Sequence, residues 1–290
     1  MRFIHAIKPR RILVYLLVVI VLFWTLGPLY FLIITSLKEY VGTITYPLPW
    51  LPRPFTWSNY SVMFSGYSPG SISYRFLHAL RNSIVASTAT TLINLVLGSS
   101  AAYVLSRAPI KGKNAISMLF LASNLLPTVA LIIPFYVLTV TYLNGLQLYD
   151  TNTLLVIVYT SFSLGLVIWI MRGYFDSIPI ELEEAARVDG CGRLKALVRI
   201  ILPLTAPGLL ATGLLTFLTS WDNFILPLVL APDSSGYNLP FFIYSLNGQY
   251  LHLNNQIAAG GLLSSIPPVL IVLFFGKYIV SGLTAGSVKG

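Results

Sequence analysis

Charged side chains are scarce in this sequence. Its 290 residues include 18 Lys and Arg and 9 Asp and Glu, so charged residues make up only 9% of the chain. A soluble domain usually carries about 25%, and the deficit leaves too few charges to cover a water-facing surface of this size. Apolar residues make up 56% of the chain, which also excludes a disordered protein. The composition therefore predicts a protein of the lipid bilayer rather than a soluble enzyme.

Residues suited to metal or redox chemistry are also rare. The one cysteine, Cys191, cannot form an internal disulfide, and the three histidines, His5, His78 and His252, are far apart. Neither has the spacing of a metal site. The phosphate-binding pattern G-x-x-x-x-G-K-[ST] is missing too, so the chain is not expected to bind ATP in that way. We predict no metal, no cofactor and no catalytic residue on this chain.

Long apolar segments dominate the sequence. About 20 mostly apolar residues cross the hydrocarbon core, and six segments come close to or exceed this length. The first follows basic residues but is too long for a signal peptide, so we expect it to be retained as a span. Prolines exclude a helix between the first two segments and predict bends within the third and the sixth. The predicted spans are residues 12–37, 77–105, 115–142, 153–171, 208–230 and 258–279.

Basic residues are distributed unevenly among the segments that join these spans. With the amino terminus in the cytosol, 14 of the 18 Lys and Arg fall on the cytosolic side, and Lys38, Arg53, Arg75 and Arg81 fall outside. The positive-inside rule therefore predicts that both termini are cytosolic. The net charge of +9 then reflects orientation and contact with anionic lipid, and no nucleic acid is needed to explain it.

Residues 172–207, between the fourth and fifth spans, form the most informative loop. They predict a helix with Ser177 as N-cap and Pro179 in its first turn, ended by Gly190. A second helix follows, and its predicted apolar face consists of Leu194, Leu197, Val198 and Ile201.

Three interpretations of this helix pair are open. It is compatible with an interfacial pair at the lipid headgroups, with a DNA-binding helix-turn-helix, and with a docking element for a soluble partner. Ala185 and Ala186 beside Glu184 favour docking, because small side chains allow close backbone approach and a carboxylate can pair with a base.

The same loop carries a family resemblance. Glu184-Ala185-Ala186, Gly190, and Ile200-x-Leu202-Pro203 resemble the E-A-A-x3-G-x9-I-x-L-P loop of ABC-importer permeases. The resemblance implies that this loop is a coupling helix, which sits in a cleft of a cytosolic ATPase subunit. The residues implied in coupling are Glu184, Ala185, Ala186, Asp189, Gly190, Ile200, Leu202 and Pro203.

Other segments resemble the carbohydrate-uptake branch of these permeases, in particular the maltose-type permease without a large extracellular domain. Asn82-Ser83, Ala101-Ala102-Tyr103, Arg107, Pro134, Ile178-Pro179 and the end of the chain, Gly282 to Gly290, carry this similarity. It implies an all-α membrane protein with six transmembrane helices and the type I importer fold. The single polytopic domain, residues 1–290, would comprise a first span and extracellular loop (1–75), a five-helix core (76–282) and a cytosolic tail (283–290).

The resemblance also implies a function and its partners. The chain would be a cell-membrane permease subunit of a sugar importer, paired with a second homologous permease. Two cytosolic ATPase subunits, which bind ATP and Mg²⁺, and an extracellular or periplasmic sugar-binding protein would complete the transporter. An ion-coupled secondary transporter, a non-sugar ABC permease and a non-transporting scaffold are the alternatives, although no set of intramembrane acids is available for a proton relay.

Asp222 is the one acidic residue placed inside a predicted span. A charge at the bilayer centre costs about 2.5–3.5 kcal/mol on insertion scales, so this side chain should face protein or a water-filled cavity. Trp221, Asp222 and Asn223 are therefore a candidate part of a sugar path. A carboxylate hydrogen-bonded to a neighbouring helix is the favoured alternative. The segment differs from the family, where the order Trp-Asn-Asp or Trp-Asn-Glu is commoner.

Overall fold

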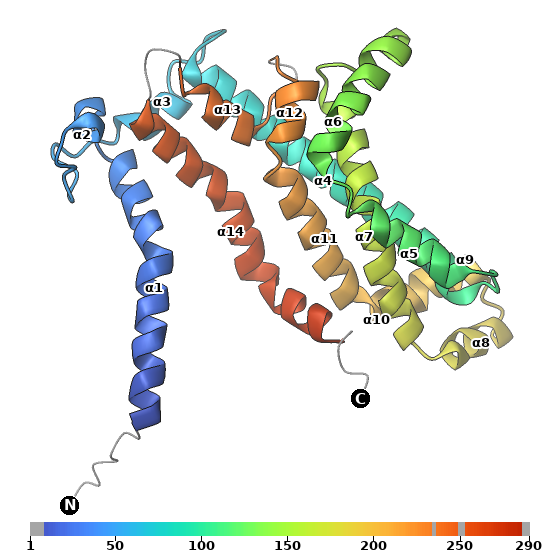
Figure 1. Ribbon diagram of the computed structural model, residues 1–290. Helices are drawn as coiled ribbons and strands as arrows, with labels where there is room; N and C mark the ends of the chain where they lie inside the picture. The colour runs from blue at the N-terminus through green and yellow to red at the C-terminus, as the bar shows by residue number, and fades with distance from the viewer. Residues whose placement is uncertain (1–8, 234–235, 249–252, 286–290) are drawn as a thin grey trace, which may run out of the picture. The chain divides into compact units, whose positions relative to one another are not determined.

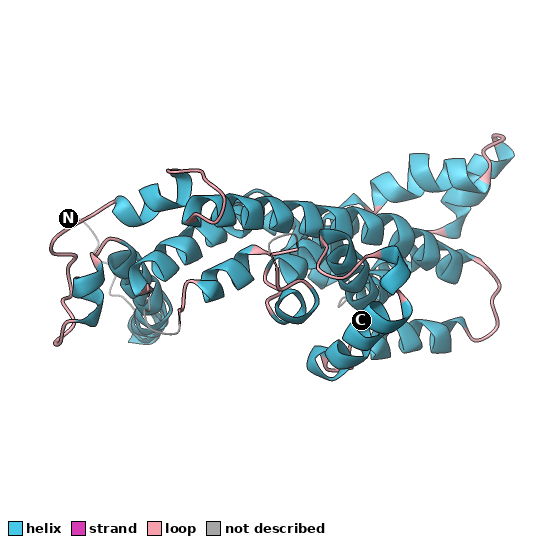
Figure 2. Cartoon of the chain, turned by 90° about the horizontal axis from the view of Figure 1, so that it is seen from above, coloured by secondary structure: helices cyan, strands magenta, loops and turns pink. Residues whose placement is uncertain are grey.

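The computed structural model of the protein describes residues 9–233, 236–248 and 253–285. Within these ranges all regular secondary structure is helical, and no β-strand is formed (Figures 1 and 2). By length and composition, four helices can cross a membrane: α1 (Pro9–Ser36), α4 (Ile72–Arg107), α7 (Asn152–Ser177) and α14 (Asn254–Ala285). Two bent helix pairs raise this number to as many as six, which agrees with the six predicted spans.

The third predicted span is the first bent pair. Helix α5 (Lys113–Ser123) stops, and α6 (Thr128–Val137) resumes and continues as the π-helix η1 (Leu138–Tyr142) at 87° to it. Pro127 is the residue before α6. It supplies no backbone N–H and disfavours the helical conformation of the residue preceding it, which explains the break. Pro134 lies inside α6, which continues past it, as α14 continues past Pro267 and Pro268.

The fifth predicted span is also interrupted. The expectation of one helix over residues 208–230 was wrong, because α11 (Ala206–Trp221) ends at Trp221 and α12 (Ile225–Leu230) starts after a gap. The side-chain oxygen of Asn223 accepts a hydrogen bond from the backbone N–H of Leu226 at 3.1 Å. This local bond competes with continuation of the helix. Asp222 therefore lies at the helix break and is exposed.

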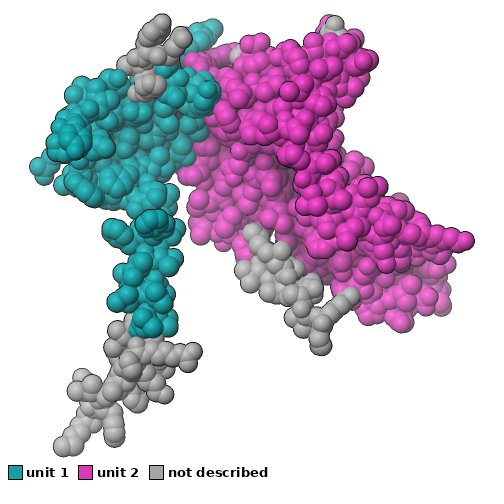
Figure 3. All heavy atoms as spheres, viewed as in Figure 1, with its two compact units in different colours: residues 1–73, 243–263 teal, residues 74–242, 264–290 magenta. Residues whose placement is uncertain are grey.

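The chain forms two compact units, residues 1–73 with 243–263 and residues 74–242 with 264–290 (Figure 3). Unit 1 contains α1 and the short helices α2 (Tyr40–Ile44) and α3 (Ser58–Phe64). The side-chain amide of Asn59 donates to the carbonyls of Ser36 and Lys38 at 2.9 and 2.8 Å, and Asn255 donates to Asn59 at 2.7 Å. These bonds join three separate segments of unit 1.

The loop after α1 is held by aromatic and polar contacts. Tyr30 donates through its hydroxyl to the carbonyl of Trp50 at 2.8 Å, and the rings of Phe31 and Trp50 lie 5.4 Å apart. The ring of Trp57 contacts both Phe55 and Tyr60. The aromatic residues of this predicted outer loop therefore contact one another and α1, although Tyr46, Trp50, Phe55 and Trp57 remain exposed.

Unit 2 has two buried apolar clusters along α7. One lies near its start and includes Leu155 with Leu226 and Leu230 of α12. The other lies near its end and includes Met171 and Phe175 with Leu197 and Ile201 of the loop 172–207 and with residues near the end of α4. The other helical elements of the unit are η2 (Asn144–Leu146), α8 (Ile180–Val188), α9 (Arg193–Ala196), the π-helix η3 (Leu197–Ile201), α10 (Leu202–Leu204) and part of α13 (Leu239–Ser245).

Two glycines let the helices beside α7 approach it closely. A Cβ atom on Gly98 of α4 would lie 2.5 Å from Cγ1 of Val167, so this glycine allows α4 to pack closely on α7. A Cβ atom on Gly165 would lie 2.2 Å from the backbone oxygen of Phe120 in α5. This second contact places α5 directly against α7.

Candidate functional site

The loop 172–207 begins with α8, and its start differs from the prediction. Ser177 is the last residue of α7, where its hydroxyl donates to the carbonyl of Tyr174 at 2.7 Å. The N-cap of α8 is Pro179, without a side-chain cap. The expected N-cap role of Ser177 was therefore wrong, because α7 extends six residues beyond the predicted end of the fourth span. Acidic Glu181 and Glu183 lie in the first turn of α8, as the helix dipole favours.

The end of α8 is the predicted glycine turn. Gly190 has a φ of +80°, a conformation that a residue with a Cβ atom adopts only at a cost. Its N–H bonds to the carbonyl of Arg187 at 3.0 Å, and the N–H of Cys191 bonds to the carbonyl of Ala186 at 2.9 Å. This pair of bonds is the Schellman motif. It turns the chain sharply from α8 into α9.

The second helix of the loop is not a regular α-helix. A single turn of α9 leads into the π-helix η3, in which the N–H of Leu202 bonds to the carbonyl of Leu197. The wider π turn shifts the phase of the side chains. The predicted single apolar face is consequently split: Leu197 and Ile201 are buried, whereas Leu194 is 74% exposed and Val198 54% exposed.

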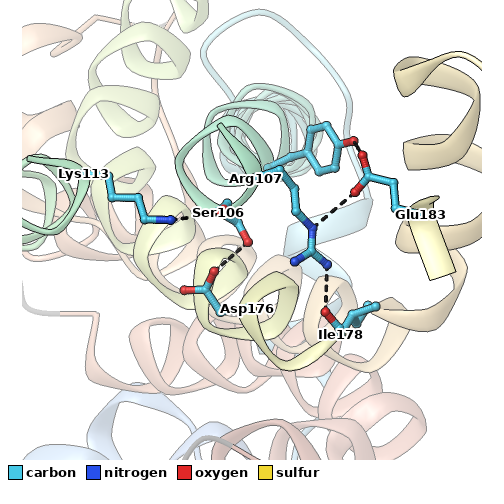
Figure 4. A network of polar contacts seen from close by, with 7 residues as sticks. Ser106, Arg107, Lys113, Asp176, Ile178 and Glu183 are labelled. Atoms are coloured by element: carbon cyan, nitrogen blue, oxygen red, sulfur yellow. Dashed lines mark hydrogen bonds and ion pairs between the residues drawn. The ribbon is translucent and has the colours of Figure 1, made fainter. Parts of the chain in front are cut away.

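Helix α8 is attached to the end of α4 by a set of polar contacts, which we call the anchor network (Figure 4). Arg107 forms an ion pair with Glu183 at 3.3 Å and donates to the carbonyl of Ile178 at 2.9 Å. The hydroxyl of Tyr103 donates to the other oxygen of Glu183. Both members of the ion pair are largely buried, with side chains 13% and 9% exposed, so solvent screens this attraction little.

The anchor network extends to the end of α7. The hydroxyl of Ser106 donates to Asp176 at 2.6 Å, and Lys113 donates to the carbonyl of Ser106 at 3.2 Å. Arg172 lies 3.5 Å from Asp176, one helical turn away. The ends of α4 and α7 are thus joined to each other and to α8. A cavity of about 400 Å³ lies between the end of α4 and the α8–α9 turn.

Sequence reasoning did not find the anchor network. Arg107 was named only among the residues that carry the family resemblance, and Glu183 was expected only within the predicted helix after Ser177. The two residues are 76 positions apart, so no local pattern connects them. The available signal was a basic residue at the end of a long apolar segment and an acid directly before the E-A-A triplet.

Five of the eight residues predicted for coupling lie on the exposed side of the loop. Glu184, Ala185, Asp189, Gly190 and Pro203 are exposed. Ala186 is 7% exposed and faces the body of unit 2. Ile200 and Leu202 are partly buried against the cluster around Met171.

The loop leads directly into α11, with one residue between α10 and α11. The chain bends by 80° between α10 and α11. A Cβ atom on Gly208 would lie 2.5 Å from the ring of Tyr174 in α7. The start of α11 is therefore in direct contact with the end of α7, which carries Asp176 of the anchor network.

The residues predicted for the sugar path are separated by the helix break. Trp221 is 1% exposed, and its indole N–H donates to the carbonyl of Ser264 at 3.1 Å. Asp222 is exposed, and its side chain makes no hydrogen bond or ion pair with the described residues, so the favoured bond to a neighbouring helix is not formed there. Asn223 lines a polar cavity. Trp221 therefore packs, and Asn223 alone of the three lines a cavity.

No group of three or more His, Cys, Asp or Glu side chains is arranged to hold a metal ion in the part of the chain that the structure describes. The tail at Gly282 to Gly290, which carries part of the resemblance, lies partly outside the described residues, since these end at Ala285.

Comparisons with known proteins agree with this architecture. Residues 94–285 match the family described as binding-protein-dependent transport system inner membrane component. The sulfoquinovosyl glycerol transport system permease protein SmoH of Agrobacterium fabrum is 32% identical over 91% of this chain and 89% of its own length. The trehalose/maltose transport system permease protein MalG of Thermococcus litoralis is 32% identical over 97% and 98%.

A solved structure shows the same fold. A chain of a bacterial ABC transporter involved in the import of the acidic polysaccharide alginate superposes with a TM-score of 0.72. It is 21% identical, and the match covers 96% of this chain and 99% of that chain. The two chains thus share their helical fold.

This chain belongs to the binding-protein-dependent transport system inner membrane components. It is a permease subunit of an ABC importer and a multi-pass membrane protein, and it is a transport component rather than an enzyme. The predicted family and the predicted all-α membrane fold are confirmed.

Proposed function

We propose that this chain imports a sugar, and that α8, the Gly190 turn and α9 couple it to a cytosolic ATPase. The observation that carries the coupling proposal is the asymmetry of this loop. One side is tied to α4 and α7 by the anchor network. The other side exposes Glu184, Ala185 and the apolar side chains of Val188, 88% exposed, and Leu194, 74% exposed. An exposed apolar pair on a rigidly held turn suits a docking surface.

The anchor network also supports a mechanical role. Because α8 is bonded to α4 and to the end of α7, a displacement of the docked turn would move these helices as a unit. The contact between Gly208 and Tyr174 adds the start of α11 to the same group. Rigid-body motion of such a group is an established way to alternate access.

The proposed orientation follows the basic residues. With 14 of 18 Lys and Arg on one side, that side and both termini are cytosolic. The docking loop then faces the cytosol, where two ATPase subunits supply ATP and Mg²⁺. A second homologous permease completes the pore, and a sugar-binding protein delivers the substrate from outside.

The names of the relatives support a carbohydrate substrate. They describe transport of sulfoquinovosyl glycerol and of trehalose or maltose, and the structural neighbour belongs to an alginate importer. All of these ligands are sugars or sugar conjugates. The proposed coupling differs from ion-coupled transport, because the energy of ATP hydrolysis would reach the permease through the cytosolic loop.

Uptake measurements test the proposed function. The complete complex, in proteoliposomes with its binding protein outside and ATP inside, should accumulate sugar. Uptake should persist when ionophores collapse the ion gradients while ATP is held constant. Uptake by the permease without the ATPase, driven by an ion gradient, would instead support a secondary transporter.

Gly190→Val tests the docking turn itself. A β-branched residue at a φ of +80° is strained by about 1–2 kcal/mol, so the turn should distort while membrane insertion remains intact. We expect at least a tenfold loss of uptake and a loss of ATPase co-purification. Gly192→Ser is the matched control, because Gly192 has a φ of −67° and serine is a favoured N-cap. Normal uptake by Gly190→Val would contradict the proposed docking role.

A further inference from the structure

The cavity between the end of α4 and the α8–α9 turn combines apolar and basic groups. Its volume is about 400 Å³, within the range of about 300–1,000 Å³ that small-molecule sites usually occupy. Apolar side chains of three elements line it, namely Val104 of α4, Ile180 of α8 and Leu197 of η3. We call it the arginine cavity, because its lining also includes Arg107, Arg187 and Arg193.

The charges of the arginine cavity do not cancel. Besides the three arginines, Glu183 and Glu184 line it, which leaves a net charge of +1. The charge of Arg107 is already used, because Arg107 is paired with Glu183 (Figure 4). Arg187 and Arg193 are exposed and form no ion pair with the described residues. Two guanidinium groups are therefore available to an anion, and their planar N–H groups suit the oxygens of a phosphate.

An exposed stripe of α4, mostly apolar, leads into the arginine cavity. Ile93, Leu97, Ser100 and Val104 are exposed, and their spacing places them on one face of the helix. From the first to the last of them the helix rises about 17 Å, at about 1.5 Å per residue. One leaflet contributes about 15 Å to the hydrocarbon core of a bilayer. The stripe therefore spans about one leaflet, and Ser100 and Val104 at its end line the cavity.

We propose that the arginine cavity binds an anionic phospholipid of the cytosolic leaflet, with its phosphate at Arg187 and Arg193 and an acyl chain along the α4 stripe. The inference goes beyond the proposed function and takes from it only the orientation, which puts the end of α4 on the cytosolic side. Basic pockets beside transmembrane helices on that side suit anionic headgroups. A zwitterionic headgroup would leave the net charge of +1 uncompensated, so an anionic one fits better.

Such a lipid would have a structural consequence. The lining residues belong to α4, α8, α9 and η3, so one bound molecule would contact both the membrane span and the loop 172–207. It would hold α8 against α4 beside the anchor network. Lipid composition would then influence how firmly the proposed docking turn is fixed.

The experiment uses the complete transporter complex, so that a cavity covered by the ATPase would bind no lipid. The complex is delipidated in detergent and titrated with phosphatidylglycerol, phosphatidylethanolamine or phosphatidylcholine of the same acyl chains, or with soluble sn-glycerol 3-phosphate. Bound lipid is measured by native mass spectrometry, together with the melting temperature. We expect phosphatidylglycerol to bind at least fivefold more tightly than the other two lipids and to raise the melting temperature, whereas glycerol phosphate should not raise it.

Arg193→Gln tests the basic group directly. It should weaken phosphatidylglycerol binding about fivefold, the contribution of one basic residue near a membrane surface. Lys195→Gln is the matched control, because Lys195 is an exposed cation of the same helix that does not line the arginine cavity. Without added lipid both variants should melt like the wild type, since neither side chain forms an ion pair with the described residues.

The outcomes separate a lipid site from the alternatives. Preferential binding of phosphatidylglycerol that is weakened by Arg193→Gln and not by Lys195→Gln supports the proposal. Equal binding of the three lipids, no bound lipid, or equal losses in the two variants overturns it. Stabilisation by glycerol phosphate as large as that by phosphatidylglycerol would assign the cavity to a soluble anion and also overturns it. No sugar uptake is measured, so these results leave the proposed function to its own test.

Discussion

Two regions of unit 2 place polar side chains among apolar helices, and they do so in opposite ways. The anchor network joins α4, α7 and α8 through the ion pair of Arg107 with Glu183 and the hydrogen bond from the Ser106 hydroxyl to the carboxylate of Asp176. The second region, a cavity of about 190 Å³ at the α5–α6 and α11–α12 breaks that we call the polar cavity, is lined by uncharged residues only. Paired charges fix helices relative to one another, whereas the uncharged lining leaves a space between the broken spans.

The largest effect is expected from breaking the charged region. Arg107→Leu leaves the carboxylate of Glu183, whose side chain is 9% exposed, without its ion pair. Removing one partner of a buried pair costs about 3–5 kcal/mol, so the apparent melting temperature of the purified permease should fall clearly. Arg187→Leu is the matched control, since Arg187 is exposed and forms no ion pair among the described residues.

A rescue sharpens this test. Replacing both members, Arg107→Met with Glu183→Met, removes the unpaired charge and should restore much of the lost stability. A melting temperature of Arg107→Leu equal to that of the wild type would show that the pair does not fix α8 to α4.

An intermediate effect is expected where α5 meets α7, beside the polar cavity. Gly165→Ala places a Cβ atom 2.2 Å from the Phe120 backbone oxygen and 2.8 Å from the Asn124 side chain. Overpacking of this kind costs about 1–3 kcal/mol, and it should displace the wall that carries Asn124. The measurement is the melting temperature together with neutral-sugar uptake.

The same helix offers the control for this substitution. Gly173 of α7 has no atom within 4 Å of a built Cβ, so Gly173→Ala should be neutral or stabilising by up to about 1 kcal/mol, since alanine is the better helix former. Equal melting temperatures for the two alanine variants would contradict the close α5–α7 contact.

The smallest effect on stability is expected at the buried Tyr159 hydroxyl. Tyr159→Phe removes a single hydroxyl that lies beside the Asn238 side chain, so the melting temperature should fall only slightly, by about 0.5–1.5 kcal/mol of free energy. This small change contrasts with the large loss of stability expected for Arg107→Leu. A large destabilisation by Tyr159→Phe would mean that the hydroxyl belongs to the packing of unit 2.

The sequence predicted the features that depend on neighbouring residues. Six spans, the break at Pro127 and the turn at Gly190 follow from hydropathy and backbone preference over short stretches. The Arg107–Glu183 pair, the contact of Gly165 with Phe120 and the Tyr159 cavity depend on residues far apart in the chain. The break after Trp221 was missed for a different reason. The apolar segment continues across it, and counting apolar residues cannot reveal the hydrogen bond from the Leu226 N–H to the side-chain oxygen of Asn223.

The interrupted spans have a consequence for hydration. A helix that stops within the membrane leaves backbone groups without partners, and such backbone is tolerated only against protein or water. At about 30 Å³ per molecule, the polar cavity has room for about six waters. A polar solute that enters this space exchanges its hydration for hydroxyl and amide contacts of a similar kind. The broken spans therefore provide a polar surface among the helices that continuous apolar helices would not expose.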